Sequence, residues 1–375
     1  MPNDVDCLEL TRELVRLNTI NPPGNEDLCA RVIGRLLEDA GFSVREHRFG
    51  PSRTSLIARI GGVPDKAPLC FTGHIDVVPL GAAPWSRDPF AGETDAGKLY
   101  GRGSTDMKCG VAAFVAAAVA LAPKLTHTAG LELVITAAEE TGCEGAFHLL
   151  RDRVLGRAGA VVVAEPTSNY PLVGHKGALW LHAKASGVTA HGSMPEKGVN
   201  AVYKAARAIG KLEAFSFDNP PHGLMGQATL NVGTVHGGLN INSVPDEAVA
   251  EVDIRTVPTV NHRHLVDELT RLLAPDVALE IFRDIGPVYT EPQDPWVQSV
   301  FEVMAPILGE RPTARVATYF TDAAPLSEAY GAPPIVILGP GEPQMAHRTD
   351  EYCMLERIRE SRTAFEQIIA RWCLD

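Results

Sequence analysis

The stretch Leu69-Cys70-Phe71-Thr72-Gly73-His74-Ile75-Asp76 is an apolar run that passes directly into two polar residues. A short apolar run of this kind, ended by a glycine, is typical of a buried strand. In α/β sheets, ligands bind beyond the carboxyl ends of the strands, so polar side chains that follow such a strand are the first candidates for a functional site. The stretch therefore predicts a sheet strand with His74 and Asp76 at its functional edge.

Similar runs alternate with helical patterns along the chain. Strand-like runs cover Ser55 to Ile60, Leu131 to Thr136, Ala160 to Ala164 and Ile335 to Leu338. An alanine-rich segment, residues 111–122, has the composition of a buried helix packed on a sheet. This alternation predicts an α/β fold, in which a mixed, mostly parallel sheet is flanked by helices on both faces.

The pattern changes from about Gly174. A strand near Ala178 to Ala185, a helix from Asn200 to Leu212, two further strands, an amphipathic helix and a last strand near Val277 to Phe282 give the order β-α-β-β-α-β. This order is typical of a ferredoxin-like α+β domain. Since 375 residues exceed the usual size of one core, we expect residues 174–285 to form a lid domain inserted into one discontinuous catalytic domain, residues 1–173 and 286–375.

Composition excludes several classes of partner. The formal net charge of −12 opposes binding to polyanions, and no basic run interleaved with aromatic residues is present, so nucleic acid is not expected as a partner. The longest apolar run, Val111 to Ala122, is too short to span a bilayer, so no membrane association is expected. The segment Met1 to Asp6 lacks the basic and apolar parts of a secretory signal, which predicts a cytoplasmic protein.

The seven cysteines are odd in number, widely scattered and without a CxxC pair. They indicate neither a disulfide framework nor a thiolate zinc site.

Other acidic and histidine residues also follow predicted strands or open the alanine-rich helix. They are Asp106 before that helix, Glu139 and Glu140 after the strand at 131–138, Glu165 after the strand at 161–164, and His347 in a loop after the strand at 335–338. Two histidines with several carboxylates and no thiolate suit zinc, manganese or cobalt, and one carboxylate could bridge two ions. An unligated glutamate beside such ions could carry a proton, which would suit hydrolysis of an amide.

Each of these signals has a simpler explanation when taken alone. His74 could be a hydrogen-bonded core histidine, and the adjacent pair Glu139-Glu140 could be a solvated turn. The set as a whole favours the metal site, because the chain shows no GxSxG elbow, no P-loop and no GxGxxG after a strand.

Longer strings surround these residues, and they are Gly73-His74-Ile75-Asp76-Val77-Val78-Pro79, Trp85 to Phe90, Tyr100-Gly101-Arg102-Gly103-Ser104-Thr105-Asp106-Met107-Lys108, Glu139-Glu140-Thr141-Gly142, Ala164-Glu165-Pro166-Thr167 and Ala346-His347. In this order and spacing the chain resembles the M20 metallopeptidases, a family that includes acetylornithine deacetylase, succinyl-diaminopimelate desuccinylase, aminoacylase-1 and the glutamate carboxypeptidases. The resemblance covers essentially the whole chain and implies a zinc-peptidase-like catalytic domain.

The resemblance also implies two divalent metal ions, with zinc as the first expectation and cobalt or manganese as alternatives. The implied ligands are His74, Asp106, Glu140, Glu165 and His347. Asp106 looks like the bridge between an ion held with His74 and Glu165 and a second ion held by the other two residues. Glu139 is then the general base, and Asp76 hydrogen-bonds His74 and fixes its tautomer without touching a metal.

The string Gly187-Val188-Thr189-Ala190-His191-Gly192-Ser193-Met194-Pro195 carries a further resemblance. In the family this histidine reaches across a dimer interface and helps stabilise the oxyanion of the partner's reaction. The resemblance therefore implies a homodimer through the lid domain, with His191 acting in trans. The alternative is a histidine that merely caps a loop.

Three residues match family positions that bind substrate: Asn242, Arg255 and Gly339. An arginine fork suits a carboxylate, so an amino-acid-like substrate is expected. A surface ion pair would equally explain Arg255, and turn geometry would explain Gly339.

The strings do not name the acyl group. The first expectation is hydrolysis of the amide bond in an N-acyl amino acid, by a deacetylase or desuccinylase type of enzyme. A dipeptidase or carboxypeptidase of the same family, acting on short peptides, is the alternative. A catalytically silent dimeric binding protein is a more remote one.

Overall fold

The computed structural model describes residues 5–375. Residues 1–4, part of the segment behind the cytoplasmic prediction, lie outside the described residues. The chain divides into two compact units. The first comprises the chain up to Gly174, Tyr289–Arg315 and Thr321–Asp375, and the second comprises His175–Val288 and Val316–Phe320.

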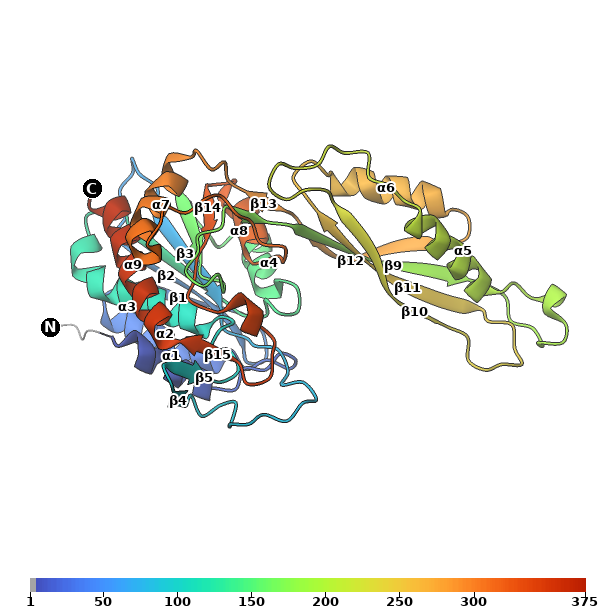
Figure 1. Ribbon diagram of the computed structural model, residues 1–375, viewed down its shortest axis with the longest axis horizontal. Coiled ribbons are helices and arrows are strands. Elements are labelled where there is room, and N and C mark those ends of the chain that lie inside the picture. Colours follow the sequence, from blue (N-terminus) through green and yellow to red (C-terminus); the bar gives the residue numbers. More distant parts are fainter. Residues whose placement is uncertain (1–4) are drawn as a thin grey trace. The chain divides into compact units, whose positions relative to one another are not determined.

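The first unit is built on a six-stranded sheet with the order β1-β2-β6-β3-β7-β14 (Figure 1). The strands are β1 (Ser43–Gly50), β2 (Arg53–Ile60), β3 (Leu69–His74), β6 (Leu131–Thr136), β7 (Ala160–Val163) and β14 (Ile335–Ile337). Strands β6, β3, β7 and β14 are parallel neighbours, whereas β1 and β2 are antiparallel additions at one side. The predicted mixed, mostly parallel sheet is confirmed.

Helices cover both faces of this sheet. They are α1 (Cys7–Arg16), α2 (Asp27–Asp39), α3 (Lys108–Leu125), α4 (Glu144–Arg151), α7 (Pro295–Leu308), α8 (Ala323–Tyr330) and α9 (Leu355–Cys373). Successive side chains of a strand point to opposite faces. On β3, Phe71 contacts the rings of Phe114 in α3 and Phe365 in α9, whereas the adjacent Cys70 contacts the Tyr330 hydroxyl of α8.

Strand register brings the functional edge together. On β3, His74 pairs with Thr136 of β6, and Thr72 pairs with Val163 of β7. Three parallel strands therefore end side by side, and the residues that follow them meet at one edge of the sheet.

Short elements complete this unit. A small sheet has the order β15-β5-β4, from β4 (Thr94–Asp95), β5 (Lys98–Tyr100) and β15 (Tyr352–Met354). The last helix begins at Leu355, because the preceding residues Tyr352–Met354 pair with β5. Two-residue strands β8 (Gly174–His175) and β13 (Val288–Tyr289) lie in sequence where the chain passes from one unit to the other.

The second unit has the predicted β-α-β-β-α-β order. Its elements are β9 (Gly177–Ser186), α5 (Ala201–Glu213), β10 (Thr229–Gly237), β11 (Glu247–Thr256), α6 (His262–Leu273) and β12 (Ala278–Ile285). The sheet is antiparallel with the order β10-β11-β9-β12. Alternate residues of β9, such as Leu179 and Leu181, form its core with Leu265 and Leu269 of α6.

One segment departs from the predicted domain boundaries. Residues 316–320 were expected in the catalytic domain, but they belong to the second unit. The reason is local pairing with the start of β9: the Lys176 N–H donates to the Ala317 carbonyl at 3.1 Å, and the Phe320 ring contacts Trp180 at a centroid distance of 5.7 Å.

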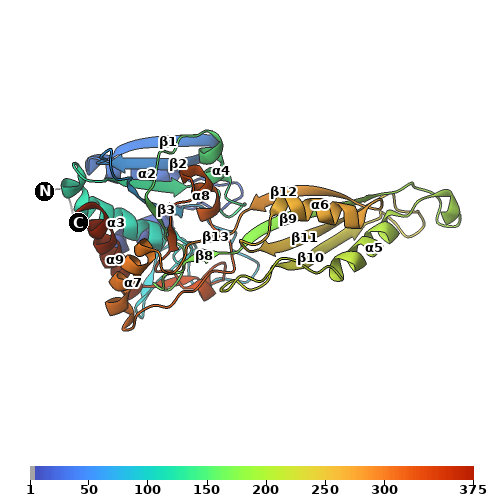
Figure 2. The same cartoon turned by 90° about the horizontal axis from the view of Figure 1, so that it is seen from above.

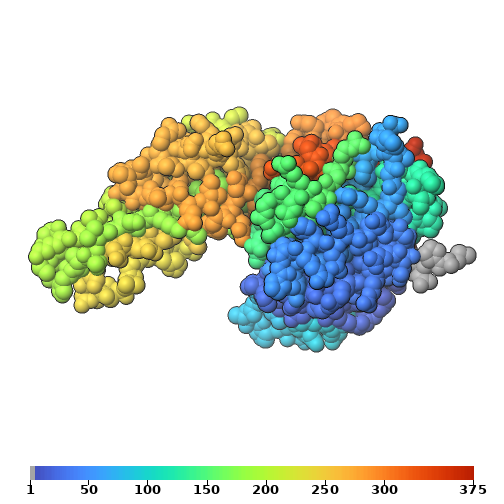
Figure 3. All heavy atoms as spheres, turned by 180° about the vertical axis from the view of Figure 1, so that it is seen from behind, coloured from blue at the N-terminus to red at the C-terminus, as the bar shows by residue number. Residues whose placement is uncertain are grey.

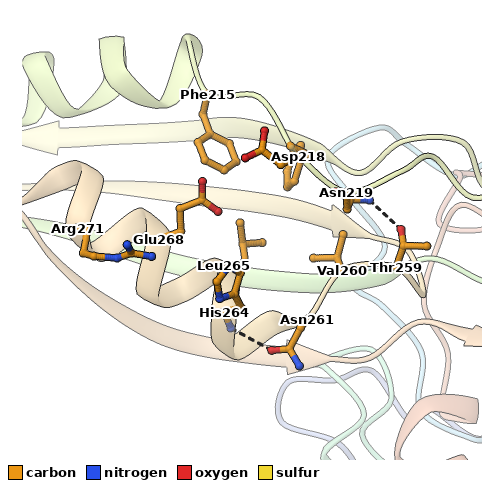
Figure 4. Close-up of a pocket in the computed structure, with 11 residues that line it drawn as sticks. Phe215, Asp218, Asn219, Thr259, Val260, Asn261, His264, Leu265, Glu268 and Arg271 are labelled. Atoms are coloured by element: carbon orange, nitrogen blue, oxygen red, sulfur yellow. Dashed lines mark hydrogen bonds between the residues drawn. The ribbon is translucent and has the colours of Figure 1, made fainter.

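The second unit also holds a cavity of about 480 Å³, between the loop after α5 and the first turns of α6. Phe215, Asp218, Leu265 and Glu268 are among its lining residues (Figure 4). None of the residues predicted for the functional site lines it. Among residues 5–375, no helix combines the length and the apolar character needed to cross a bilayer.

Candidate metal centre

The carboxylate of Asp106 lies between the two predicted histidine ligands. Its Oδ1 is 3.1 Å from Nε2 of His74, and its Oδ2 is 3.4 Å from Nε2 of His347. Each oxygen therefore faces a different imidazole. This is the placement expected of a carboxylate that bridges two ions.

The two glutamates join opposite sides of Asp106. Glu140 Oε2 is 3.1 Å from Nε2 of His347, and Glu165 Oε1 is 3.9 Å from Nε2 of His74. The structure thus brings all five predicted ligands together, in the two groups that the resemblance implies. That these side chains hold ions stays a prediction.

The set fits a divalent cation. Burial raises the pKa of Glu165 well above its usual range, and the Asp106 carboxylate adds to the rise. Burial and Asp106 raise the pKa of Glu140 in the same way, and Glu140 Oε1 is buried without a hydrogen-bond partner. Buried carboxylates that face one another are costly unless a cation neutralises them. Oxygen and imidazole ligands suit zinc or manganese.

These carboxylates raise the pKa values of both histidines. Hydrogen bonds to Asp106 and Glu140 raise the pKa of His347 to about 10. For His74, burial acts in the opposite sense, but the nearby carboxylates of Asp106 and Asp76 raise its pKa well above the usual value. Because a metal binds only the neutral imidazole, protons and metal ions compete for this set.

Asp76 has a wider role than the one predicted for it. The Nδ1 atom of His74 is 3.0 Å from the backbone carbonyl of Asp76 but 3.5 Å from its carboxylate Oδ1. The carboxylate instead accepts the backbone N–H groups of Glu139 and Glu140, at 3.0 and 3.1 Å, and the side-chain amide of Asn21 at 2.9 Å. Consecutive N–H groups form a natural anion site. Asp76 therefore fastens the Glu139-Glu140 loop to the end of β3.

Glu139 lies beside the ligands but turns its carboxylate toward Cys143. Its Oε1 accepts a hydrogen bond from the Cys143 thiol at 3.6 Å. Burial raises the pKa of Glu139 well above its usual range, against the charge of His74 and with that of Glu165. The preceding Ala138 has a φ of +60°, an unusual conformation for a non-glycine residue. A buried carboxyl with a raised pKa suits the proton carrier expected of a general base.

Comparison with known proteins identifies the family of the chain that carries this site. The model of the peptidase family M20/M25/M40 matches residues 70–371. The chain belongs to this family. It is therefore a metal-dependent hydrolase of amide bonds.

This M20 chain is similar over most of its length to proteins named as deacylases. It is 31% identical to an acetylornithine deacetylase of Proteus mirabilis, over 98% of the chain and 97% of the relative. It is 29% identical to a probable succinyl-diaminopimelate desuccinylase of Staphylococcus epidermidis, over 93% of each.

Solved structures share its fold. A tripeptidase from Staphylococcus aureus matches with a TM-score of 0.77 and 22% identity, over 98% of both chains. An M20 metallo-carboxypeptidase from Sulfolobus solfataricus matches with a TM-score of 0.81 and 18% identity, over 97% of this chain and 98% of the other.

Two acidic residues near the M20 site were missed by sequence reasoning. Asp322, at the start of α8, is buried and accepts a hydrogen bond from the Thr136 hydroxyl at 2.5 Å. Burial raises its pKa to about 6. The only signal was its place in the string Thr321-Asp322-Ala323, where a single acid stands among small and apolar residues.

The second missed acid, Glu351, holds the loop of Asp106. Its carboxylate accepts the backbone N–H groups of Thr105 at 2.8 Å and of Asp106 at 3.1 Å. It also forms a buried ion pair with Arg102, 2.5 Å long. Burial raises the pKa of Glu351 to about 7, although the Arg102 charge acts against the rise. Glu351 thereby fixes the backbone from which the Asp106 carboxylate projects.

Gly339 is explained by close packing. A Cβ atom at this position would lie 2.2 Å from the carbonyl oxygen of Ala164 and 2.5 Å from that of Glu165. The glycine lets the loop after β14 approach the backbone that carries a predicted ligand. Its contact with substrate stays a prediction.

The remaining predicted residues belong to the second unit. His191 is exposed, and its Nδ1 lies 2.8 Å from the Ser193 hydroxyl. The Gly192 N–H donates to the Asn242 carbonyl at 2.7 Å, so the His191 and Asn242 loops are neighbours. The roles of both residues stay predictions.

Arg255 forms the ion pair that was the alternative to a substrate-binding role. Its guanidinium forms a 3.0 Å ion pair with Asp253 and lies over the rings of Trp180 and Phe320. A role in substrate binding would require exchange of the Asp253 carboxylate for that of a ligand.

Proposed function

We propose that this M20 chain is an N-acyl-amino-acid deacylase of the deacetylase or desuccinylase type. The observation that carries the proposal is the 31% identity to an acetylornithine deacetylase over nearly the full length of both chains. The grouping of the five ligand-type side chains around Asp106 supports the chemistry.

In this proposal the five side chains hold two divalent ions, with zinc as the first expectation and cobalt or manganese as alternatives. When bound, such ions lower the pKa of water and polarise the acyl carbonyl oxygen. Glu139 accepts a proton from the attacking water and returns it to the amide nitrogen as the carbon–nitrogen bond breaks. The products are an amine and a carboxylic acid. Asp76 keeps the Glu139 backbone in place during both transfers.

Arg255 is proposed to bind the substrate carboxylate, because its present ion pair with Asp253 can be replaced. The ion pair between Arg255 and Asp253 is half-exposed, so a substrate carboxylate can take the place of Asp253 in the guanidinium fork. Asn242 and the turn at Gly339 are proposed to contact the remainder of the substrate.

A substrate panel tests the proposal. The purified chain, loaded with zinc or with cobalt, is assayed on acetyl, succinyl and formyl amino acids and on unblocked dipeptides. We expect hydrolysis of at least one acyl amino acid in preference to the dipeptides. Hydrolysis of dipeptides alone would favour the peptidase alternative. No hydrolysis with either metal would favour the silent binding protein.

We also propose that two copies associate through the second unit and that His191 acts in the partner's site. Large apolar side chains stand exposed on this unit: Val188, Tyr203, Val235, Leu239 and Ile241. Leu239 and Ile241 are fully exposed, at 97% and 103%. Exposed apolar groups on one surface are typical of an association site. The exposed His191 ring is available to a second copy.

A further inference from the structure

A second group of metal-ligating side chains lies on the first unit, between the edge strand β1 and the end of α4. His47 is on β1, His148 is on α4, and Asp152 follows that helix. One ligand atom from each residue lies within 4.8 Å of the others. Figure 2 shows α4 close to one end of β1, and in Figure 3 the green surface around α4 borders the blue surface that contains β1.

Secondary structure explains why these side chains meet. His47 and Phe49 are two residues apart on β1, where the strand register shifts between Arg48 and Gly50. Phe49 stacks on the His148 ring, with centroids 4.6 Å apart and an interplanar angle of 21°. His148 and Asp152 are four residues apart, which places them on one face of the helix end. The packing of α4 on β1 therefore assembles the group.

The spacing of His47 and Asp152 is that of two ligands of one ion. Nε2 of His47 lies 3.1 Å from Oδ2 of Asp152, yet this nitrogen is buried and makes no hydrogen bond. Two donors that bind one tetrahedral zinc at 2.0–2.1 Å lie about 3.3 Å apart. The distance between the His47 and Asp152 atoms is therefore close to that of two ligands of one zinc ion, although the two atoms do not form a hydrogen bond.

The cationic side chain of Arg151 lies beside this group. Its Nη2 lies 2.5 Å from Nδ1 of His148. The side chain is 67% exposed, so it can rotate into solvent at little cost. A metal ion and the guanidinium would compete for the same imidazole.

We propose that His47, His148 and Asp152 bind one divalent transition-metal ion of the zinc type, at a site separate from the candidate metal centre. Two imidazoles and one carboxylate are a zinc ligand set that leaves a fourth position for water. A bound ion would fasten the end of α4 to β1. Because α4 begins four residues after Glu140, the ion would steady the element that follows the Glu139-Glu140 loop.

The test counts zinc ions. Full-length protein is dialysed to equilibrium against increasing free Zn²⁺, and bound zinc per chain is measured by atomic emission. We expect His47→Gln to bind one zinc fewer than the wild type at saturation. Asp152→Asn should weaken the affinity for this zinc ion by more than about tenfold, since even residues that only hydrogen-bond a metal ligand change metal affinity 10–100-fold. Arg151→Ala should raise the affinity for this zinc ion, because it removes the competing guanidinium.

The matched control is His127→Gln, which changes an exposed histidine outside the group and should bind as much zinc as the wild type. Equal binding by wild type and His47→Gln across the whole range would overturn the proposal. If His47→Gln does not fold, Asp152→Asn decides in the same way, because its carboxylate is 45% exposed. The result is a difference between variants, so it does not depend on the ions held elsewhere.

Discussion

Adjacent glutamates have different surroundings in this M20 hydrolase. Glu140 faces the His347 imidazole, whereas the Glu139 carboxylate lies against the Cys143 thiol. Both backbone N–H groups are held by the one carboxylate of Asp76. This arrangement separates a residue suited to hold a cation from one that is free to move a proton.

Replacing Glu139 should therefore separate metal binding from turnover. We expect Glu139→Gln to keep its metal content and to lose kcat by about 10²–10⁴-fold or more, the usual contribution of a general base. The measurements are metal content and single-turnover kinetics, with the exposed Glu213→Gln as control. Retained activity would exclude Glu139 as the base.

Replacing Glu351 should destabilise the Asp106 loop. Glu351→Gln leaves Arg102 buried without its counter-charge, which costs about 3–5 kcal/mol. We expect a matching loss in the free energy of unfolding, measured in urea, together with weaker zinc binding. Glu93→Gln, which removes an exposed partner of Arg87, is the control and should change little. Equal stability of the two variants would contradict the role given to Glu351.

The sequence pattern identified site residues that directly follow strands. It did not identify residues that hold the site in place from distant positions in the sequence. His74 and Glu165 stand next to apolar runs, so the pattern marks them. Asp322 and Glu351 bond to Thr136 and Asp106 across 186 and 245 residues, and no local pattern carries that information. The preference of the His74 ring for the Asp76 carbonyl over its carboxylate likewise depends on backbone geometry that sequence does not reveal.

At the level of elements, the buried strands of the first unit could be predicted, whereas its edge strand β1 could not. Strands β3, β6 and β7 are buried throughout and mainly apolar, so their composition marks them. Strand β1 lies at the sheet edge and contains the charged residues Arg45, Glu46 and Arg48, and α4 is only eight residues long. Neither gives a clear apolar period, so the surface between them was not expected.

The loop after β14 should tolerate no side chain at position 339. In Gly339→Ala, the new methyl group would meet the carbonyl oxygens of Ala164 and Glu165, so the backbone carrying Glu165 must shift. We expect a lower midpoint of thermal unfolding and a weaker affinity for zinc. Gly286→Ala, where a methyl group meets no atom within 4 Å, is the control. If both variants bind zinc like the wild type, the packing role is wrong.

For the whole molecule, metal loading should release protons. The pKa values of His74 and His347 are raised in the metal-free protein, so both rings are protonated at neutral pH. Since the metal binds the neutral ring, each ion displaces protons and its affinity falls as the pH is lowered. Titration calorimetry in buffers of different ionisation enthalpy measures this release. His347→Ala should release fewer protons, and a heat that is independent of buffer would contradict the prediction.

Association of two copies has its own test. If His191 acts in the partner's site, His191→Ala and Glu139→Gln should each be inactive alone. A mixture should regain activity, because one site of each heterodimer keeps an intact Glu139 and receives an intact His191. Differently tagged variants show whether heterodimers form. Heterodimers without any regained activity would exclude action in trans.

The contact between Glu351 and the Asp106 loop also determines when the candidate metal centre can form during synthesis of the chain. The Asp106 carboxylate is synthesised first, and the Glu351 carboxylate that holds its backbone follows 245 residues later. The second unit lies almost entirely between them in sequence, so its local contacts can form on the ribosome first. Long-range contacts of this kind slow folding. The nascent chain thus carries an unfinished candidate metal centre until Glu351 has been translated.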